Sequence, residues 1–194
     1  MATQLFTLGQ TPLNSIRTLP SSSYLVHATN CIAQWGAGIA AELAEVFPHA
    51  CKEYKKFCSD AKPGSSTRWP PESLTGQCLI IPPQSADVAA GAPSVFIVCL
   101  FTSYGFGRPN DRTGKPGKDP KSKILSQTRT SLKEFRLQLE SNPNDKVQSE
   151  IVIYSPMFNS GAFKVPWGET ASLIEDAFCG WSGRWLVMEP PSTP

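Results

Sequence analysis

Apolar residues recur at helical spacing in several segments of the chain. In residues 38–47 they lie three and four positions apart, which predicts an amphipathic helix. Pro48 ends this helix or starts the next one, which we expect to reach about Cys58. Further helices are expected from Lys121 to about Ser141 and over residues 169–178. The apolar stripe of the first of these comprises Ile124, Leu125, Thr128, Leu132, Phe135 and Leu139.

Short apolar runs bounded by turn-forming residues predict the strands. Residues 78–81 and 95–101 are apolar without alternation, as in strands buried on both faces of a sheet. Other strands are expected at residues 5–8, 24–28, 150–154 and 185–188. Residues 61–76 and 104–120 are expected to form loops. Because strands and helices alternate, the predicted class is α/β, with a mixed central sheet of about six strands sandwiched between helices.

Composition places the chain among soluble globular proteins. Its 194 residues suffice for one domain with its own core, expected over residues 1–189 and followed by a flexible tail at 190–194. The content is 40% hydrophobic and 18% charged, and the net charge of +2 gives no strong nucleic-acid footprint and no attraction to membranes. No run approaches the ~20 apolar residues that span a bilayer.

The six cysteines show no zinc spacing and no CxxC pair. Several lie in apolar runs, so we expect buried, reduced thiols. With no secretory leader expected either, the predicted location is the cytoplasm, the nucleus or both.

A glycine-rich turn follows the strand that ends near Asn30. Gly36 and Gly38 open the first predicted helix, and glycine lets backbone N–H groups approach a ligand. A helix N-terminus adds about half a positive charge, so the turn can cradle a phosphate or diphosphate. A plain strand-to-helix bend that needs glycine only for its dihedral angles explains this turn equally well.

The same residues satisfy a G-x-G-x-x-A dinucleotide fingerprint, but the context argues against a nicotinamide enzyme. The fingerprint requires its first glycine immediately after the strand, whereas here several residues intervene. It also requires an acidic residue about 20 positions on, at the tip of the next strand. Asp60 instead follows a helix.

A second turn of this kind follows the strand at residues 150–154. Asn159, Ser160 and Gly161 supply a hydroxyl, small side chains and an accessible backbone, and a helix begins near Gly168. Two such loops after strands of one α/β sheet can grip both sides of a single phosphate-bearing ligand. The two turns together therefore support a phosphate-binding site more strongly than either turn does alone.

These motifs together resemble those of the macrodomains. The segment 7–10 lies where the family has a strand-end Gly-Asp, 26–30 resembles its Val-Asn-Ala-Ala-Asn, and 36–40 and 159–167 resemble its two phosphate loops. The resemblance extends from the first strand to the last helix. Within the family, the chain is most similar to the fungal-type ADP-ribose 1''-phosphate phosphatases. The residues that carry this narrower resemblance are His27, Asn30, Cys31, Trp35, Gly36, Cys99–Ser103, Asn159–Gly161, Phe163 and Val165–Trp167.

The resemblance implies a ligand site. A diphosphate would lie between the two loops, Asn30 would bind the distal ribose beside Phe163, and Gln10 would take the adenine-contact position. The implied substrate-binding residues are Gly9, Gln10, Trp35, Gly36, Ala37, Gly38, Ile39, Ala40, Asn159, Ser160, Gly161, Ala162 and Phe163, and the implied catalytic residues are His27 and Asn30.

The chain departs from the family at three points. Gln10 offers an amide where most members have a carboxylate toward adenine. A related branch that removes ADP-ribose from protein carboxylates uses a lysine and an aspartate where this chain has Ser103 and Phe163. Other hydrolases of the family orient a water with an asparagine at the position of His27.

His27 is the candidate acid–base group. A histidine with a pKa near ~6.5 can act at neutral pH as a general base, a general acid or a nucleophile toward phosphorus. A structural histidine that binds a backbone carbonyl is the alternative. No cofactor is implied, and no His, Cys or carboxylate spacing indicates a metal.

The resulting hypothesis is metal-independent hydrolysis of ADP-ribose 1''-phosphate to ADP-ribose and phosphate. The alternatives are a non-catalytic reader of ADP-ribose, with ADP-ribosylated protein as its partner, and a hydrolase that removes ADP-ribose from protein or nucleic acid. We expect a monomer. Arg108, Arg112, Lys115 and Lys118 give the 104–120 loop a basic character that fits either a solvated surface or a lid closing on phosphate.

Overall fold

A six-stranded mixed sheet organises the protein in the computed structural model, which describes residues 6–142 and 151–190. The strand order is β1-β6-β5-β2-β4-β3, with β3 antiparallel to β4 and all other neighbours parallel. The strands are β1 (Gly9–Thr11), β2 (Tyr24–Asn30), β3 (Cys78–Ile81), β4 (Phe96–Ser103), β5 (Val152–Ser155) and β6 (Arg184–Met188).

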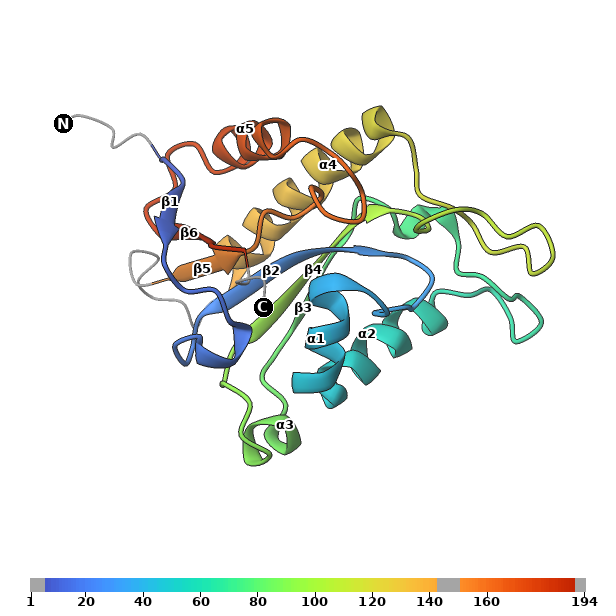
Figure 1. Ribbon diagram of the computed structural model, residues 1–194, viewed down its shortest axis with the longest axis horizontal. Helices are drawn as coiled ribbons and strands as arrows, with labels where there is room; N and C mark the ends of the chain where they lie inside the picture. Colours follow the sequence, from blue (N-terminus) through green and yellow to red (C-terminus); the bar gives the residue numbers. More distant parts are fainter. Residues whose placement is uncertain (1–5, 143–150, 191–194) are drawn as a thin grey trace.

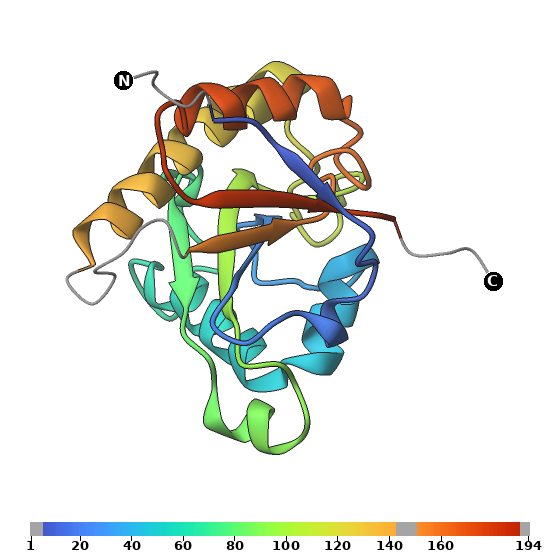
Figure 2. The ribbon, with the colours of Figure 1, turned by 90° about the vertical axis from the view of Figure 1, so that its left-hand side faces the viewer.

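Helices cover both faces of this sheet (Figures 1 and 2). α4 and α5 pack on one face, and α1 and α2 pack on the other. The short α3 lies between β3 and β4 at the far end of the molecule. The helices are α1 (Gly38–Val46), α2 (Pro48–Asp60), α3 (Ser85–Ala89), α4 (Lys121–Ser141) and α5 (Trp167–Ala177), with 3-10 turns at Ile16–Thr18 and Glu72–Leu74.

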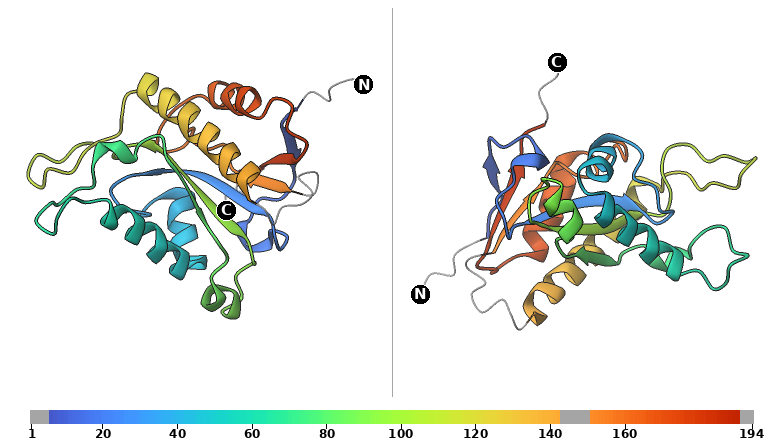
Figure 3. Two further views of the ribbon diagram at one scale, coloured as in Figure 1. Left: turned by 180° about the vertical axis from the view of Figure 1, so that it is seen from behind. Right: turned by 90° about the horizontal axis from the view of Figure 1, so that it is seen from below.

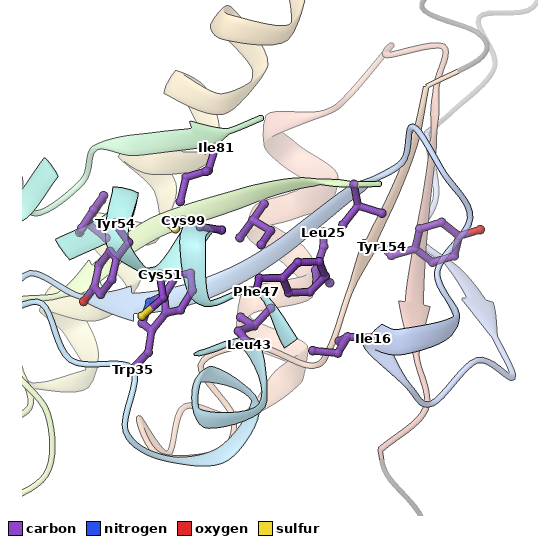
Figure 4. Packing of buried hydrophobic residues seen from close by; sticks show 14 of the residues in the cluster. Ile16, Leu25, Trp35, Leu43, Phe47, Cys51, Tyr54, Ile81, Cys99 and Tyr154 are labelled. Atoms are coloured by element: carbon purple, nitrogen blue, oxygen red, sulfur yellow. The ribbon is translucent and has the colours of Figure 1, made fainter. Parts of the chain in front are cut away.

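Alternation along the strands divides the core into two layers. On β2, Leu25 faces α1 and α2, where Leu43, Tyr54 and Cys51 are buried (Figure 4). Its neighbour Val26 belongs to the opposite layer, which α4 and α5 cover. β2 is therefore buried on both faces, as an interior parallel strand requires.

A long-range cap fixes the start of α2. The carboxylate of Asp87 in α3 is 1% exposed and accepts hydrogen bonds from the N–H groups of His49 and Ala50, both at 3.0 Å. It also lies 2.8 Å from Nδ1 of His49. These bonds satisfy backbone donors that the first turn of a helix leaves without partners. His49 thus has a structural role at the start of α2.

Most predicted elements are confirmed. The α/β class, the mixed six-stranded sheet and the helix from Lys121 to Ser141 are all present. In that helix the predicted stripe is buried except for the half-buried Leu125. All six cysteines are free, and only Cys179 is exposed. Of the predicted strand at 150–154 and the predicted tail at 190–194, residues 150 and 191–194 lie outside the described residues.

The predicted first strand is wrong. Thr7 and Leu8 lie outside any strand, Leu5 is not among the described residues, and β1 starts only at Gly9. Phe6 instead packs against Phe178 and Trp181 in the core. The apolar pattern at residues 5–8 therefore reflects the packing of Phe6 in the core. β1 itself pairs with β6 through its backbone and carries polar residues at the sheet edge. α3 was not predicted.

Candidate functional site

The main cavity lies where two parallel strands diverge. β2 and β5 pair only at Tyr24 with Ile153 and at Leu25 with Tyr154. Beyond these pairs β2 continues beside β4, and a cavity of about 520 Å³ opens at the carboxyl ends of β2, β5 and β6. Its lining comes from five strands (β1, β2, β4, β5 and β6), near their ends or from the segments that follow them: Asn14, Ile16, Ala28, Gln34, Gly36–Ala40, Glu42, Phe106, Pro156–Asn159, Gly161–Phe163 and Met188–Pro190.

Asn30 organises the loop that leads from β2 to the first glycine turn. Its Oδ1 accepts from the N–H groups of Ile32 (3.0 Å) and Gln34 (3.4 Å), and its Nδ2 donates to the carbonyl of Gln34 (2.8 Å). The hydroxyl of Tyr54 donates to the Asn30 carbonyl at 2.8 Å and to Oδ1 at 3.0 Å. Asn30 is 6% exposed and does not line the cavity, so its side chain holds the loop.

Trp35 anchors the same loop from behind. Its ring stacks on Tyr54 with centroids 4.8 Å apart, and its Nε1 donates to Thr29 Oγ1 at 3.2 Å. Figure 4 shows Trp35 beside Tyr54 and Cys51 in the layer under α1 and α2. Trp35 is therefore part of the core and not of the cavity lining.

The N-terminus of α1 faces the cavity without a side-chain cap. Ala37 is the N-cap and accepts no hydrogen bond through its side chain, and Gly38 has a left-handed φ of 57°. Gly36 and Gly161 have no positive φ, and a Cβ at either would meet no atom within 4 Å. Of these three glycines, only Gly38 is therefore required for its backbone angle. At Gly36 and Gly161, glycine leaves open space at the cavity.

Asn159 fixes the second loop. Its Oδ1 accepts from Thr102 Oγ1 (2.8 Å) and its Nδ2 donates to Thr128 Oγ1 (2.9 Å), which joins the loop to β4 and α4. The residue has a left-handed φ of 65° and its carbonyl accepts from the N–H of Val165 at 2.8 Å. Asn159 lines the cavity, but its amide is committed to the fold.

The remaining residues of the second loop differ in position. Gly161, Ala162 and Phe163 line the cavity, and Phe163 is 8% exposed among apolar neighbours. Ser160 is exposed and outside the lining, and its hydroxyl binds the carbonyl of Met157.

His27 points away from the cavity. Its neighbour Ala28 lines the cavity, whereas His27 is 0% exposed on the opposite face of β2. Its ring meets Trp35 edge-on at 5.0 Å, and Nε2 lies 3.4 Å from Cys99 Sγ. Nδ1 has no hydrogen-bond partner, and burial lowers the pKa of His27 from 6.5 to about 4. In this arrangement the neutral imidazole has no exposed atom, and its catalytic role stays a prediction.

Gln10, the predicted adenine contact, and Gly9, predicted to bind substrate, also lie outside the lining. Gln10 is exposed on the edge strand β1, and Gly9 pairs with Leu186 of β6. A Cβ at Gly9 would lie 2.7 Å from the Leu186 side chain, so close strand packing accounts for this glycine. Of the predicted site, Gly36–Ala40, Asn159 and Gly161–Phe163 are brought together; Gly9, Gln10, His27, Asn30, Trp35 and Ser160 are not.

Several lining residues escaped the sequence interpretation. Asn14 and Ile16 follow β1, Met188 ends β6 and Glu189 follows it, so these residues reach the cavity only through the pairing of the two strands. Phe106 comes from the loop after β4. The one sequence feature that these residues share is a position at or shortly after the end of a strand. Many other residues have such a position.

No group of three or more His, Cys, Asp or Glu side chains within residues 6–142 and 151–190 is arranged to hold a metal ion. No helix in these ranges has the length and apolarity to cross a membrane.

Comparison with solved structures defines the fold. The macrodomain of Mycobacterium tuberculosis DarG superimposes with a TM-score of 0.62 and 16% identity, covering 96% of this chain and 97% of that one. Thermosipho africanus DarTG, solved in complex with ADP-ribose, gives a TM-score of 0.59 and 13% identity over 89% of this chain and 40% of that one. The protein therefore has the macrodomain fold.

Sequence relatives define the family. The ADP-ribose 1''-phosphate phosphatase of Neosartorya fischeri is 30% identical, with 81% of this chain and 84% of the relative covered. The protein of the same name from Debaryomyces hansenii is 34% identical, with 78% and 81% covered. No family model matches the sequence. The chain belongs to the family of these ADP-ribose 1''-phosphate phosphatases, as its motifs predicted.

Burial of His27 predicts a stability that falls with acidification. The unfolded state binds a proton near pH 6.5 and the folded state only near pH 4, so the unfolding free energy decreases as pH falls between these values. We expect this group alone to contribute a loss of about 3 kcal/mol. Chemical denaturation across this range, compared between the wild type and His27→Leu, isolates the contribution because the carboxylates are common to both.

A His27→Leu protein with the wild-type pH dependence would refute the buried, neutral histidine. Phosphate release by the same variant tests the other role. A fall of about 100-fold or more at unchanged ligand affinity is the size expected for a lost general acid or base. Activity within a few-fold of wild type would remove that role.

The anchoring of the second loop by Asn159 predicts a large effect of Asn159→Ala. The change leaves the buried hydroxyl of Thr102 without its acceptor and places alanine at a positive φ, so we expect a loss of about 2–4 kcal/mol in unfolding free energy. Ser160→Ala, which removes an exposed hydroxyl, is the control, with an expected change within about 0.5 kcal/mol. Equal thermal stability of the two variants would contradict the anchor.

Proposed function

We propose that this chain binds ADP-ribose 1''-phosphate in the main cavity and hydrolyses it to ADP-ribose and inorganic phosphate. The observation that carries the proposal is the pair of glycine turns, Gly36–Ala40 and Gly161–Phe163, that line one cavity. The family to which the chain belongs consists of relatives named for this activity, which supports the choice of substrate.

Backbone groups hold the diphosphate in this proposal. The cavity lining contains no lysine or arginine among the described residues. The N–H groups of the first turn of α1 are available because helix geometry leaves them without intrahelical acceptors. Together with the helix dipole they favour an anion at this position. The open space at Gly36 and Gly161 lets the ligand approach both turns closely.

The carboxylates of the lining would lie away from the phosphates. Glu42 forms an ion pair with Arg17 at 3.8 Å, beside the 3-10 turn that contains Ile16. Glu189 follows β6, next to Met188. Both therefore border the part of the cavity that the chain ends form, and we assign that part to the uncharged base of the ligand.

The reaction is attack by water on the phosphorus of the 1''-phosphate. The P–O bond to the ribose breaks, the ribose oxygen takes a proton, and phosphate leaves. The protein contributes positioning of the ester and neutralisation of its charge, which dominate catalysis of phosphoryl transfer. His27 stays a candidate for the proton transfers only if its ring can reach the ester.

Removal of ADP-ribose from protein carboxylates is less well supported. Ser103 takes the place of the lysine of the related branch, is 0% exposed, and donates to the carbonyl of Gly105 at 2.8 Å. Its oxygen also accepts from the N–H of Asp119 at 3.0 Å. Phe163 takes the place of the aspartate and belongs to an apolar cluster. Both positions thus have structural roles.

The assay that tests the proposal is incubation of the purified chain with ADP-ribose 1''-phosphate. We expect phosphate and ADP-ribose to appear in equal amounts, and ADP-ribose to bind the protein in calorimetry. Binding of ADP-ribose without phosphate release would replace the enzyme with a reader. Absence of binding at millimolar ADP-ribose would refute both functions.

The space at the first turn predicts the effect of Gly36→Ala. The added methyl meets no protein atom, so we expect an unchanged melting temperature, but it fills space that the ligand needs. The dissociation constant for ADP-ribose should rise by about tenfold or more, which corresponds to about 1.4 kcal/mol. Gly168→Ala is the matched control, because its methyl also meets no atom but lies outside the cavity lining. Wild-type affinity of Gly36→Ala would mean that the ligand does not approach this turn.

A further inference from the structure

The 104–120 loop has a fixed internal structure. It extends beyond the end of β4 in Figures 1 and 3. Asn110 and Lys115 form a β-bridge, and the N–H of Lys118 donates to the carbonyl of Gly107 at 2.9 Å. The two arms pack backbone against backbone, since a Cβ at Gly117 would lie 2.8 Å from the nitrogen of Pro109. The loop is thus a compact hairpin-like unit.

The base of this loop is tied to the sheet and to α4. Asp119 accepts hydrogen bonds from the N–H of Tyr104 at 2.8 Å and from Nε2 of Gln127 at 3.0 Å. Gln127 also donates to the carbonyl of Thr102 in β4 at 2.7 Å. The loop therefore leaves β4 and enters α4 in a defined direction.

Lys115 holds the two arms together. Its ammonium donates to the carbonyls of Phe106 (2.5 Å), Arg108 (3.0 Å) and Pro116 (3.4 Å). It also lies 4.1 Å from the centroid of the Phe106 ring. An ammonium has three donors, and all three are directed to carbonyls of the loop. This lysine is therefore committed to the loop and is not available as a phosphate-binding cation.

Phe106, which Lys115 contacts, also faces the cavity. It lines the cavity and packs against the cluster of Ile124, Phe163 and Val165. Ala28, on β2, contacts the same cluster and also lines the cavity. The Phe106 and Phe163 rings thus wall the part of the cavity between the end of β2 and the second glycine turn.

We propose that Lys115 is a positioning residue that fixes Phe106 as a wall of the ligand site, where the phenyl ring packs against the distal sugar of the ligand. An aromatic ring supplies an apolar surface to the C–H face of a sugar, and three carbonyl bonds plus a cation–π contact hold that ring in place. The assignment of the sugar to this wall rests on the proposed function. It replaces both sequence interpretations of Lys115, the solvated surface and the phosphate-closing lid.

The test is a double-mutant cycle with ADP-ribose and ADP-ribose 1''-phosphate. Lys115→Met and Phe106→Ala should each raise the dissociation constant for ADP-ribose by about tenfold. The double variant should be no weaker than the weaker single variant, because both changes remove the same wall. KM for ADP-ribose 1''-phosphate should rise by the same factor as the dissociation constant for ADP-ribose. Lys118→Met is the matched control, since Lys118 bonds to the loop through its backbone N–H, and it should bind as wild type does.

The outcomes separate the inference from the proposed function. Multiplying effects in the double variant would show that Lys115 does not act through Phe106. An effect of Lys115→Met on KM for the 1''-phosphate but not on ADP-ribose binding would show direct phosphate contact and would overturn the inference. Wild-type binding by Lys115→Met would do the same. If the wild-type protein itself fails to bind ADP-ribose, the proposed function fails instead.

Discussion

The short pairing between β2 and β5 determines where this molecule can bind a ligand. These parallel strands share a register only at Tyr24 with Ile153 and at Leu25 with Tyr154. At the ends of these strands the chain passes from β2 toward α1 on one face of the sheet, and from β5 toward α5 on the other (Figure 1). A crevice at such a divergence is the usual ligand position of an open α/β sheet. The loops, the helix N-terminus and the chain ends are arranged around it.

Two buried amides make this arrangement stable. The Asn30 side chain is hydrogen-bonded to the backbone of Ile32 and Gln34. The Asn159 side chain is hydrogen-bonded to the hydroxyl groups of Thr102 and Thr128. Both residues belong to motifs that suggest direct ligand contact. In the folded chain their side chains instead hold two loops whose main chains face the cavity. In the proposed function, recognition therefore depends on backbone N–H groups and open space. Asn30 lies outside the cavity lining, whereas Asn159 belongs to the lining with its amide bonded to the fold.

Local patterns sufficed for the elements whose burial is regular. The helical stripe around Leu132 and the apolar run from Val95 each report the environment of one element. A strand was wrongly predicted at residues 5–8 because the apolar Phe6 packs in the core and does not belong to a paired strand. The two glycine turns were found because glycine marks a left-handed backbone, as at Gly38, or open space, as at Gly36 and Gly161. Glu189 and Phe106 were not predicted to line the cavity. Glu189 reaches it through the pairing of β6, and Phe106 reaches it through the internal hydrogen bonds of the 104–120 loop. His27 lies one residue from the lining, and only strand alternation determines which way it points.

The pairing of β1 with β6 joins Gly9 to Leu186, so the two ends of the chain meet in one wall of the cavity. Contacts so distant in sequence require the closure of a very long loop, which costs conformational entropy and slows folding. Asn14 and Met188 reach the cavity through this long-range pairing. In the proposed function, a ligand in this cavity contacts the chain ends and α1 at the same time. Its binding would therefore stabilise the outer strands against local opening.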